Sequence, residues 1–204
     1  MILVGQYDSP FVRRVAIALH HYDMQFERRV LSVFSDLDTM LQLNPLGKVP
    51  ALALDIGEVL IDSQFILDYL DGIVDAERAL VPPAGAARRE VLNVTAIALG
   101  LAEKAVALRW ELHRRRPQSI DPDWVERLQR QVTSCLRWLE ARALSTWLST
   151  TQMTLADVTT VVAYTYLWHK HEPMFRVGQY PRLDDLATRC EALPEFMAAP
   201  YVEG

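Results

Sequence analysis

The sequence changes character at Val81-Pro82-Pro83, and this change limits the folds that the chain can adopt. Residues 1–80 combine short apolar runs of strand length with segments of helical periodicity. Beyond the two prolines no strand-like alternation of apolar and polar residues follows, and residues 85–115 are rich in good helix formers. We therefore expect an α/β domain over residues 1–80, a linker at 81–83 and an all-α domain over residues 84–204.

The first domain is predicted to have the element order β-α-β followed by β-β-α. The segments with these patterns are residues 2–7, the helical residues after Ser9-Pro10, residues 25–31, Ala51–Leu54, Val59–Ile61 and a helix that begins at Asp62-Ser63. This order predicts a mixed four-stranded sheet with helices packed against it. The buried stripe of the last helix is predicted to contain Phe65, Ile66, Tyr69, Leu70 and Ile73.

Capping residues locate two helix starts in the second domain. Asp121-Pro122 combines an N-cap side chain with a proline at the first helical position, and Thr154-Leu155-Ala156-Asp157 is a capping box. The basic run at residues 113–116 precedes Pro117, so we place it at a helix C-terminus, where cations complement the helix dipole. The second domain is therefore expected to contain helices only.

Composition excludes several classes of function. The formal net charge of -5 is unlike that of nucleic-acid-binding domains, and no apolar run approaches the roughly 20 residues of a membrane span. Residues 1–8 lack the basic and apolar regions of a signal peptide, so we expect a cytoplasmic protein. Cys135 and Cys190 form no C-x-x-C pair, and neither histidine pair has a Cys or carboxylate at ligand spacing. We expect reduced cysteines and no metal site.

The dipeptide Ser9-Pro10 is the first of three motifs that can bind an anionic peptide. A helix N-terminus offers unpaired amide donors and a partial positive charge, and a serine hydroxyl at the N-cap can donate as well. If the anion is a thiolate, this environment lowers the thiol pKa from its ordinary value of about 8.5. A shift of about two units corresponds to roughly 2.7 kcal/mol. Helix capping alone also explains the dipeptide.

The second motif is Leu46-Gly47-Lys48-Val49-Pro50. A proline that enters a strand lacks a ladder donor and belongs at the first residue or at an edge. If the bond before Pro50 is cis, the N–H and C=O of Val49 turn outward and can pair with an extended peptide. A plain turn-to-strand proline is the alternative interpretation.

The third motif is Asp62-Ser63 at the start of a helix. Ser63 and the first helical amides can hold a carboxylate, while Asp62 can neutralise an ammonium group. Together these residues suit an α-amino-acid group. An ordinary helix cap is again the alternative interpretation.

In this order, the motifs resemble the cytosolic glutathione S-transferase superfamily over essentially the whole chain. The resemblance is carried by a Ser-Pro-Phe-x-x-Arg-Val opening from Ser9 to Val15, the Leu-Gly-Lys-Val-Pro loop, the pair Asp62-Ser63 in place of Glu/Gln-Ser, and the capping box at Thr154. The opening Val-Gly-x-Tyr-x-Ser-Pro-Phe-Val-Arg is similar to that of bacterial, serine-type proteins of the YibF kind.

The resemblance implies a thioredoxin-like N-terminal domain, an all-helical C-terminal domain and a homodimer, with glutathione as co-substrate and no metal. The glutathione-binding residues carried over are Ser9 at the sulfur, Phe11, Lys48 at the glycyl carboxylate, Val49 and cis-Pro50 at the cysteinyl backbone, and Asp62 and Ser63 at the γ-glutamyl end. Asp62 is one methylene shorter than the usual Glu or Gln.

The implied reaction is a detoxifying transfer of glutathione to a small apolar electrophile. The residues expected to line the electrophile pocket are Tyr7, Phe11, Val12, Trp110, His113 and Tyr166. Tyr7 is an alternative to Ser9 as the thiolate stabiliser. Relatives that exchange disulfides have cysteine where this chain has Ser9, so mixed-disulfide chemistry is not expected. A non-catalytic regulator with this fold, like the stringent starvation proteins, is the alternative function.

Overall fold

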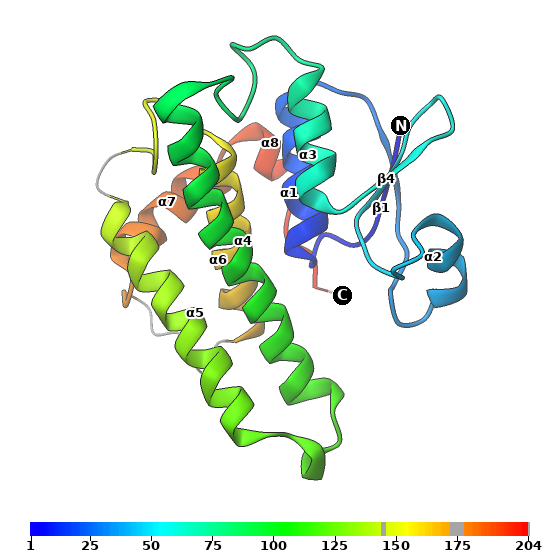
Figure 1. Ribbon diagram of the computed structural model, residues 1–204, viewed down its shortest axis with the longest axis vertical. Helices are drawn as coiled ribbons and strands as arrows, with labels where there is room; N and C mark the ends of the chain where they lie inside the picture. Colours follow the sequence, from blue (N-terminus) through cyan, green and yellow to red (C-terminus); the bar gives the residue numbers. More distant parts are fainter. Residues whose placement is uncertain (144–145, 172–177, 204) are drawn as a thin grey trace. The chain divides into compact units, whose positions relative to one another are not determined.

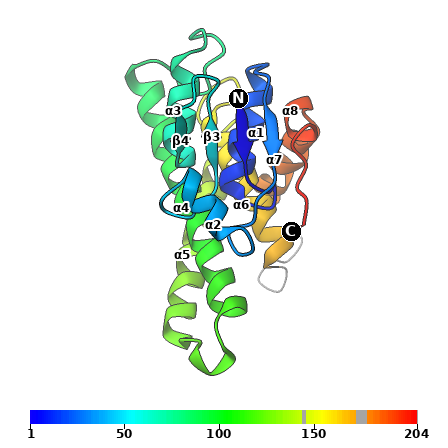
Figure 2. The ribbon, with the colours of Figure 1, turned by 90° about the vertical axis from the view of Figure 1, so that its right-hand side faces the viewer.

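A computed structural model describes residues 1–143, 146–171 and 178–203. The contacts of the chain divide it into two units, of which the first joins residues 1–80 to residues 191–204 and the second comprises residues 81–190. The last residues, which the sequence patterns grouped with the helical part, therefore belong with the α/β part. Each unit is described separately below (Figures 1 and 2).

Four short strands form the sheet of the first unit. They are β1 (Ile2–Val4), β2 (Glu27–Arg29), β3 (Ala51–Ala53) and β4 (Val59–Ile61), in the order β2-β1-β3-β4. Strand β1 pairs parallel with β2 and antiparallel with β3, and β3 pairs antiparallel with β4. The mixed four-stranded sheet and its hairpin are thus confirmed.

Helices cover both faces of this sheet (Figure 1). On one face α1 (Pro10–His21) packs against α3 (Ser63–Gly72). On the other face α2 (Leu37–Leu43) contributes Met40, which packs with Val4 and Ala51. The predicted order included no helix in this segment, because α2 is short and buries one side chain only, so it carries little periodic signal. The arrangement is the expected thioredoxin-like one.

Helix α3 has two apolar stripes, one buried and one exposed. Its buried residues are Ser63, Ile66, Leu67 and Leu70. Three other apolar side chains are exposed: Phe65 at 71% of its surface, Tyr69 at 38%, and Ile73, which lies just beyond the helix, at 54%. The prediction that they lie on the buried stripe was wrong. Because they recur at four-residue spacing, they form a second apolar stripe along one side of the helix.

The second unit contains helices and, in its described residues, no strand. Its elements are α4 (Gly85–Arg114), the 3-10 turn η1 (Pro117–Ser119), α5 (Pro122–Arg142), α6 (Leu155–Lys170) and α7 (Pro181–Glu191), whose last residue belongs to the first unit. Helix α4 packs against α5 and α6, and α6 is buried on nearly every side, as a core helix is. The all-helical expectation is confirmed for this part.

Helix α4 is long and apolar enough to cross a membrane by length and composition, alone among the helices of the described residues. The apolar stretch of α4 is not continuous in the sequence, because Glu103 and Lys104 interrupt it. A core helix of a folded unit has the same composition, and α4 buries one stripe of residues from Val91 to Glu111. The length and composition of α4 are therefore weak evidence for a membrane span.

Both predicted helix caps are present. Asp121 accepts hydrogen bonds from the N–H groups of Asp123 and Trp124. Asp157 is fully buried, and its carboxylate accepts from the Leu148 N–H and from the N–H and hydroxyl of Thr154, each at 2.8 Å. Burial raises the pKa of Asp157, and these hydrogen bonds lower it. The capping box thus fixes the start of α6.

Candidate functional site

Ser9 is the N-cap of α1, and Pro10 occupies the first helical position. The Ser9 Oγ accepts a hydrogen bond from the Val12 N–H at 3.4 Å. Because the oxygen is the acceptor in this bond, the hydroxyl hydrogen remains for donation to a ligand. Pro10 has no N–H, and the Phe11 N–H meets no acceptor in the described part of the chain. The start of α1 therefore presents one hydroxyl donor and one amide donor.

The loop before β3 contains the predicted cis bond, between Val49 and Pro50. Buried Asn44 shapes this loop: its Nδ2 donates to the Lys48 C=O at 2.7 Å, and its Oδ1 accepts from the Leu46 N–H at 2.9 Å. Among the residues that the structure describes, none bonds to the N–H or C=O of Val49. These two groups are therefore available to an extended peptide ligand.

Gly5 holds α1 and this loop close together. Its φ of 136° is strained for any side chain, and a Cβ added to it would lie 2.5 Å from Cγ2 of Val12 and 3.1 Å from Cβ of Val49. Only a residue without a side chain fits between them. The first and second motifs therefore meet across Gly5.

The start of α3 joins the same site through Arg14 of α1. Arg14 is 1% exposed, and its Nη1 donates to the Ser63 Oγ and its Nη2 to the Gln64 Oε1, both at 3.2 Å. Asp62, the N-cap, accepts from the Gln64 N–H at 2.8 Å and has φ 67° and ψ 124°, a conformation that non-glycine residues rarely adopt. Such strain in a helix cap is typical of functional sites. The third motif thus lies beside the first.

Arg14 is a candidate site residue that the sequence-based prediction did not include. An arginine can only donate, so Ser63 accepts from it and keeps its own hydrogen for a ligand carboxylate. Burial lowers the pKa of Arg14 to about 9, and the charge of Asp62 raises it. In the described part of the chain no partner reaches the buried Nε. A buried cation of this kind favours an anion beside it. The sequence feature that could have identified Arg14 is a charged residue within the mostly apolar segment that forms α1.

Tyr7, the alternative thiolate stabiliser, is packed under a cation. It is 5% exposed, and the guanidinium carbon of Arg28 lies 3.7 Å from the centre of its ring. Burial raises the pKa of Tyr7, while the charge of Arg28 lowers it. The ring is therefore part of the packing around β1 and β2.

The residues predicted for the electrophile pocket are divided between the units. In the first unit Tyr7 and Val12 are buried and Phe11 is half-buried. In the second unit Trp110 and His113 are exposed and Tyr166 is buried. Partial desolvation lowers the pKa of His113, and so does the charge of Arg109. A common pocket of these six residues stays a prediction.

Comparison with known proteins agrees with the motif order. The family profile "Glutathione S-transferase, N-terminal domain" matches residues 3–78, which include all three motifs. The chain is 30% identical to the uncharacterized GST-like protein YibF of Escherichia coli (strain K12) over 167 residues, 82% of each protein. The chain belongs to the glutathione S-transferase family.

Solved transferase structures share the whole fold. A family member from Pseudomonas fluorescens Pf-5, solved with bound glutathione, is 29% identical, covers 99% of both chains and has a TM-score of 0.87. A transferase from Methylobacillus flagellatus KT, solved with glutathione bound, is 26% identical over 98% of this chain and 99% of that one, with a TM-score of 0.92. Among the described residues there is no group of three or more His, Cys, Asp or Glu side chains that could hold a metal ion.

Proposed function

We propose that this protein is a glutathione transferase that binds glutathione in its first unit and activates the thiol as a thiolate. The observation that carries the proposal is the meeting of three ligand-binding motifs, joined by Gly5 and Arg14. Gly5 brings Val12 against Val49, and Arg14 hydrogen-bonds Ser63. The relatives solved with bound glutathione support the choice of ligand.

Each end of glutathione has a chemically matched partner in this proposal. The Ser9 hydroxyl and the Phe11 amide donate to the sulfur, and the backbone of Val49, shaped by Pro50, pairs with the cysteinyl residue. Exposed Lys48 binds the glycyl carboxylate. Ser63 donates to the γ-glutamyl carboxylate, and Asp62 neutralises the γ-glutamyl ammonium.

The reaction that follows is an attack by the thiolate on an apolar electrophile. The sulfur lone pair forms the new S–C bond, and the displaced group leaves with the electron pair of the bond that breaks. Ser9 stabilises the sulfur anion and does not itself attack. Donors fixed in advance at the sulfur lower the thiol pKa, because no reorganisation is needed when the charge forms.

Arg14 gives the first prediction. Replacing Arg14 with methionine should weaken glutathione binding about 10–100-fold, since a charge-assisted contact is worth roughly 1.5–3 kcal/mol. The chain should still fold, because methionine fills a similar buried volume without a charge. Titration calorimetry with glutathione, with circular dichroism as the folding check, measures both effects. Arg28→Met, at the exposed cation over Tyr7, is the matched control and should bind as the wild type does.

A glutathione-affinity column separates the proposed function from its alternative. The folded protein should be retained and eluted by free glutathione. Turnover should then appear in a panel of aryl halides, isothiocyanates, enones and peroxides. A folded protein that passes through the column unretained would leave the non-catalytic regulator as the better account.

The exposed stripe on α3 supports the proposal that the protein is a homodimer. Phe65, Tyr69 and Ile73 place three exposed apolar side chains on one side of α3, and a contiguous apolar patch of this kind marks an interaction surface. The wild type should have twice the mass of one chain in sedimentation equilibrium, and Phe65→Glu should shift it toward the monomer. Trp124→Glu, at an apolar residue of α5 that is 42% exposed, should stay dimeric. A dimer that tolerates Phe65→Glu would place the interface elsewhere.

A further inference from the structure

Residues 191–199 contact α1, the helix whose N-cap is Ser9. We call residues Glu191–Ala199 the C-terminal strap. The strap contains α8 (Pro194–Met197), which packs on α1. It belongs to the first unit together with residues 1–80, although more than a hundred residues of helical unit separate the two in sequence.

Arg13 makes the main contact between α1 and the strap. Its side chain is 1% exposed, and its Nη1 and Nη2 donate to the two carboxylate oxygens of Glu191 at 2.8 and 2.5 Å. Its Nε donates to the Ala199 C=O at 2.8 Å. The guanidinium carbon lies 5.9 Å from the ring centre of Phe196, which is fully buried. A bidentate ion pair with a third hydrogen bond fixes both the position and the orientation of the side chain.

The backbone of the same residue closes the first turn of α1. The Arg13 N–H donates to the Ser9 C=O at 3.0 Å. Since Arg13 is held by its side chain on Glu191 and Ala199 and by its backbone on Ser9, a displacement of these two strap residues is passed to the first turn. That turn contains the Ser9 hydroxyl and the Phe11 amide, the two donors available to an anion.

We propose that Arg13 is a positioning residue for thiol activation, and that the C-terminal strap, through Glu191 and Ala199, holds the first turn of α1 in its donor geometry. The inference rests on the proposed function, because it concerns the same sulfur site. It adds that a segment without any assigned glutathione contact sets the pKa of the bound thiol. The two adjacent arginines of α1 thus have different roles, because Arg14 contacts the ligand-binding start of α3 and Arg13 contacts the strap.

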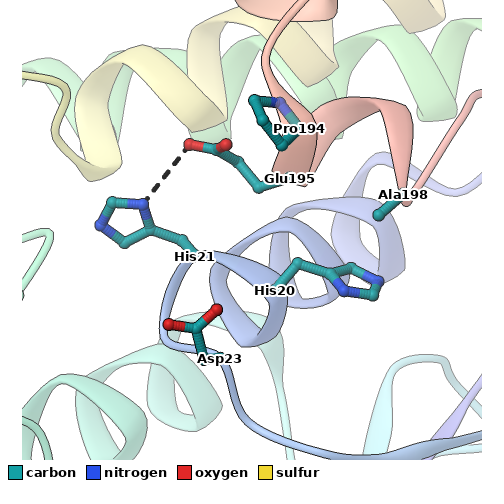
Figure 3. A pocket seen from close by; sticks show the side chains of 6 residues that line it. All are labelled: His20, His21, Asp23, Pro194, Glu195 and Ala198. Carbon is teal, nitrogen blue, oxygen red and sulfur yellow. Dashed lines mark ion pairs between the residues drawn. The ribbon is translucent and has the colours of Figure 1, made fainter.

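A second strap contact provides a matched control at the far end of α1. His21 Nδ1 lies 3.4 Å from Glu195 Oε1, and the two side chains point toward each other beside a shallow pocket (Figure 3). His21 is about three helical turns from Ser9. Breaking this pair removes one contact between α1 and the strap but leaves the Arg13 contacts with Glu191 and Ala199 in place.

The test compares Glu191→Gln and Arg13→Met with Glu195→Gln. Amide hydrogen exchange reports on the first turn without any ligand, and ultraviolet absorbance of bound glutathione against pH gives the thiol pKa. In Glu191→Gln the Val12 and Arg13 amides should exchange at least tenfold faster, and the bound thiol pKa should rise by about one unit, a tenfold change in the thiol equilibrium. Arg13→Met should move both in the same direction and further. Glu195→Gln should match the wild type in both.

Each outcome decides between the two proposals. If Glu191→Gln melts at a lower temperature but keeps the wild-type thiol pKa, the strap has a structural role only and the inference is wrong. This conclusion holds even if Arg13→Met fails to fold. Equal effects of Glu191→Gln and Glu195→Gln would also overturn it. A wild-type protein that shows no thiolate signal refutes the proposed function itself, and with it the role of Arg13 in thiol activation. The exchange data would still show whether the strap orders the first turn of α1.

Discussion

Gly5→Ala is expected to lower the free energy of unfolding by about 3 kcal/mol or more, the sum of backbone strain and overpacking. The new Cβ would lie 2.5 Å from Cγ2 of Val12, a side chain with no exposed surface. The φ of 136° at this position adds strain for any residue with a side chain. Urea unfolding measures the loss. The same substitution should also weaken glutathione binding, because it pushes α1 away from Val49.

Two other glycines separate the two causes. Gly57, in the hairpin, has φ 90° but no atom within 4 Å of an added Cβ, so Gly57→Ala should show backbone strain alone, about 1–2 kcal/mol. Gly72, at the end of α3, has neither feature, and Gly72→Ala should be neutral or slightly stabilising. Equal losses for Gly5→Ala and Gly57→Ala would mean that the close approach of Val12 contributes nothing.

Ser9→Ala should reduce turnover with an aryl halide about 25-fold at pH 7, because a thiol pKa that returns from about 6.5 to about 8.5 lowers the thiolate fraction from roughly three-quarters to about 3%. Glutathione should bind within a few fold of the wild type, since the contacts proposed at Lys48, Val49 and Ser63 are unchanged. The lost cap should cost only about 1 kcal/mol of stability. Steady-state kinetics and calorimetry on the same samples separate the chemical effect from binding.

Ser9→Thr and Tyr7→Phe are the controls for this prediction. Threonine keeps a capping hydroxyl and should retain most of the activity. Tyr7→Phe should be active, because Tyr7 is buried beneath Arg28 and its pKa is raised by burial. A large loss in Tyr7→Phe, with Ser9→Ala near the wild type, would assign the role to the tyrosine.

The parts of the fold that depend on local chemistry were predictable from the sequence. The Ser9 and Asp121 caps, the capping box at Thr154 and the hairpin around Gly57 each depend on residues a few positions apart. Neighbouring residues are enough to select these conformations. The family resemblance added the cis bond before Pro50, which no local pattern decides.

The contacts that join the site were not predictable in this way. Arg13 and Arg14 are adjacent charged residues of one helix, yet one pairs with Glu191 and the other with Ser63, 178 and 49 positions away. Periodicity assigns a residue to a helix face and says nothing about its distant partner. The exposed Phe65 was misplaced for a related reason, because an apolar residue at helical spacing can face a core or a second chain.

The start of α1 is proposed to stabilise a glutathione thiolate. The pH titration of thiolate absorbance in the wild-type complex tests this claim most directly. We expect a midpoint about two units below the ordinary thiol pKa of about 8.5. A midpoint at the ordinary value, with glutathione bound, would contradict the proposal and leave a protein that binds the tripeptide without activating it.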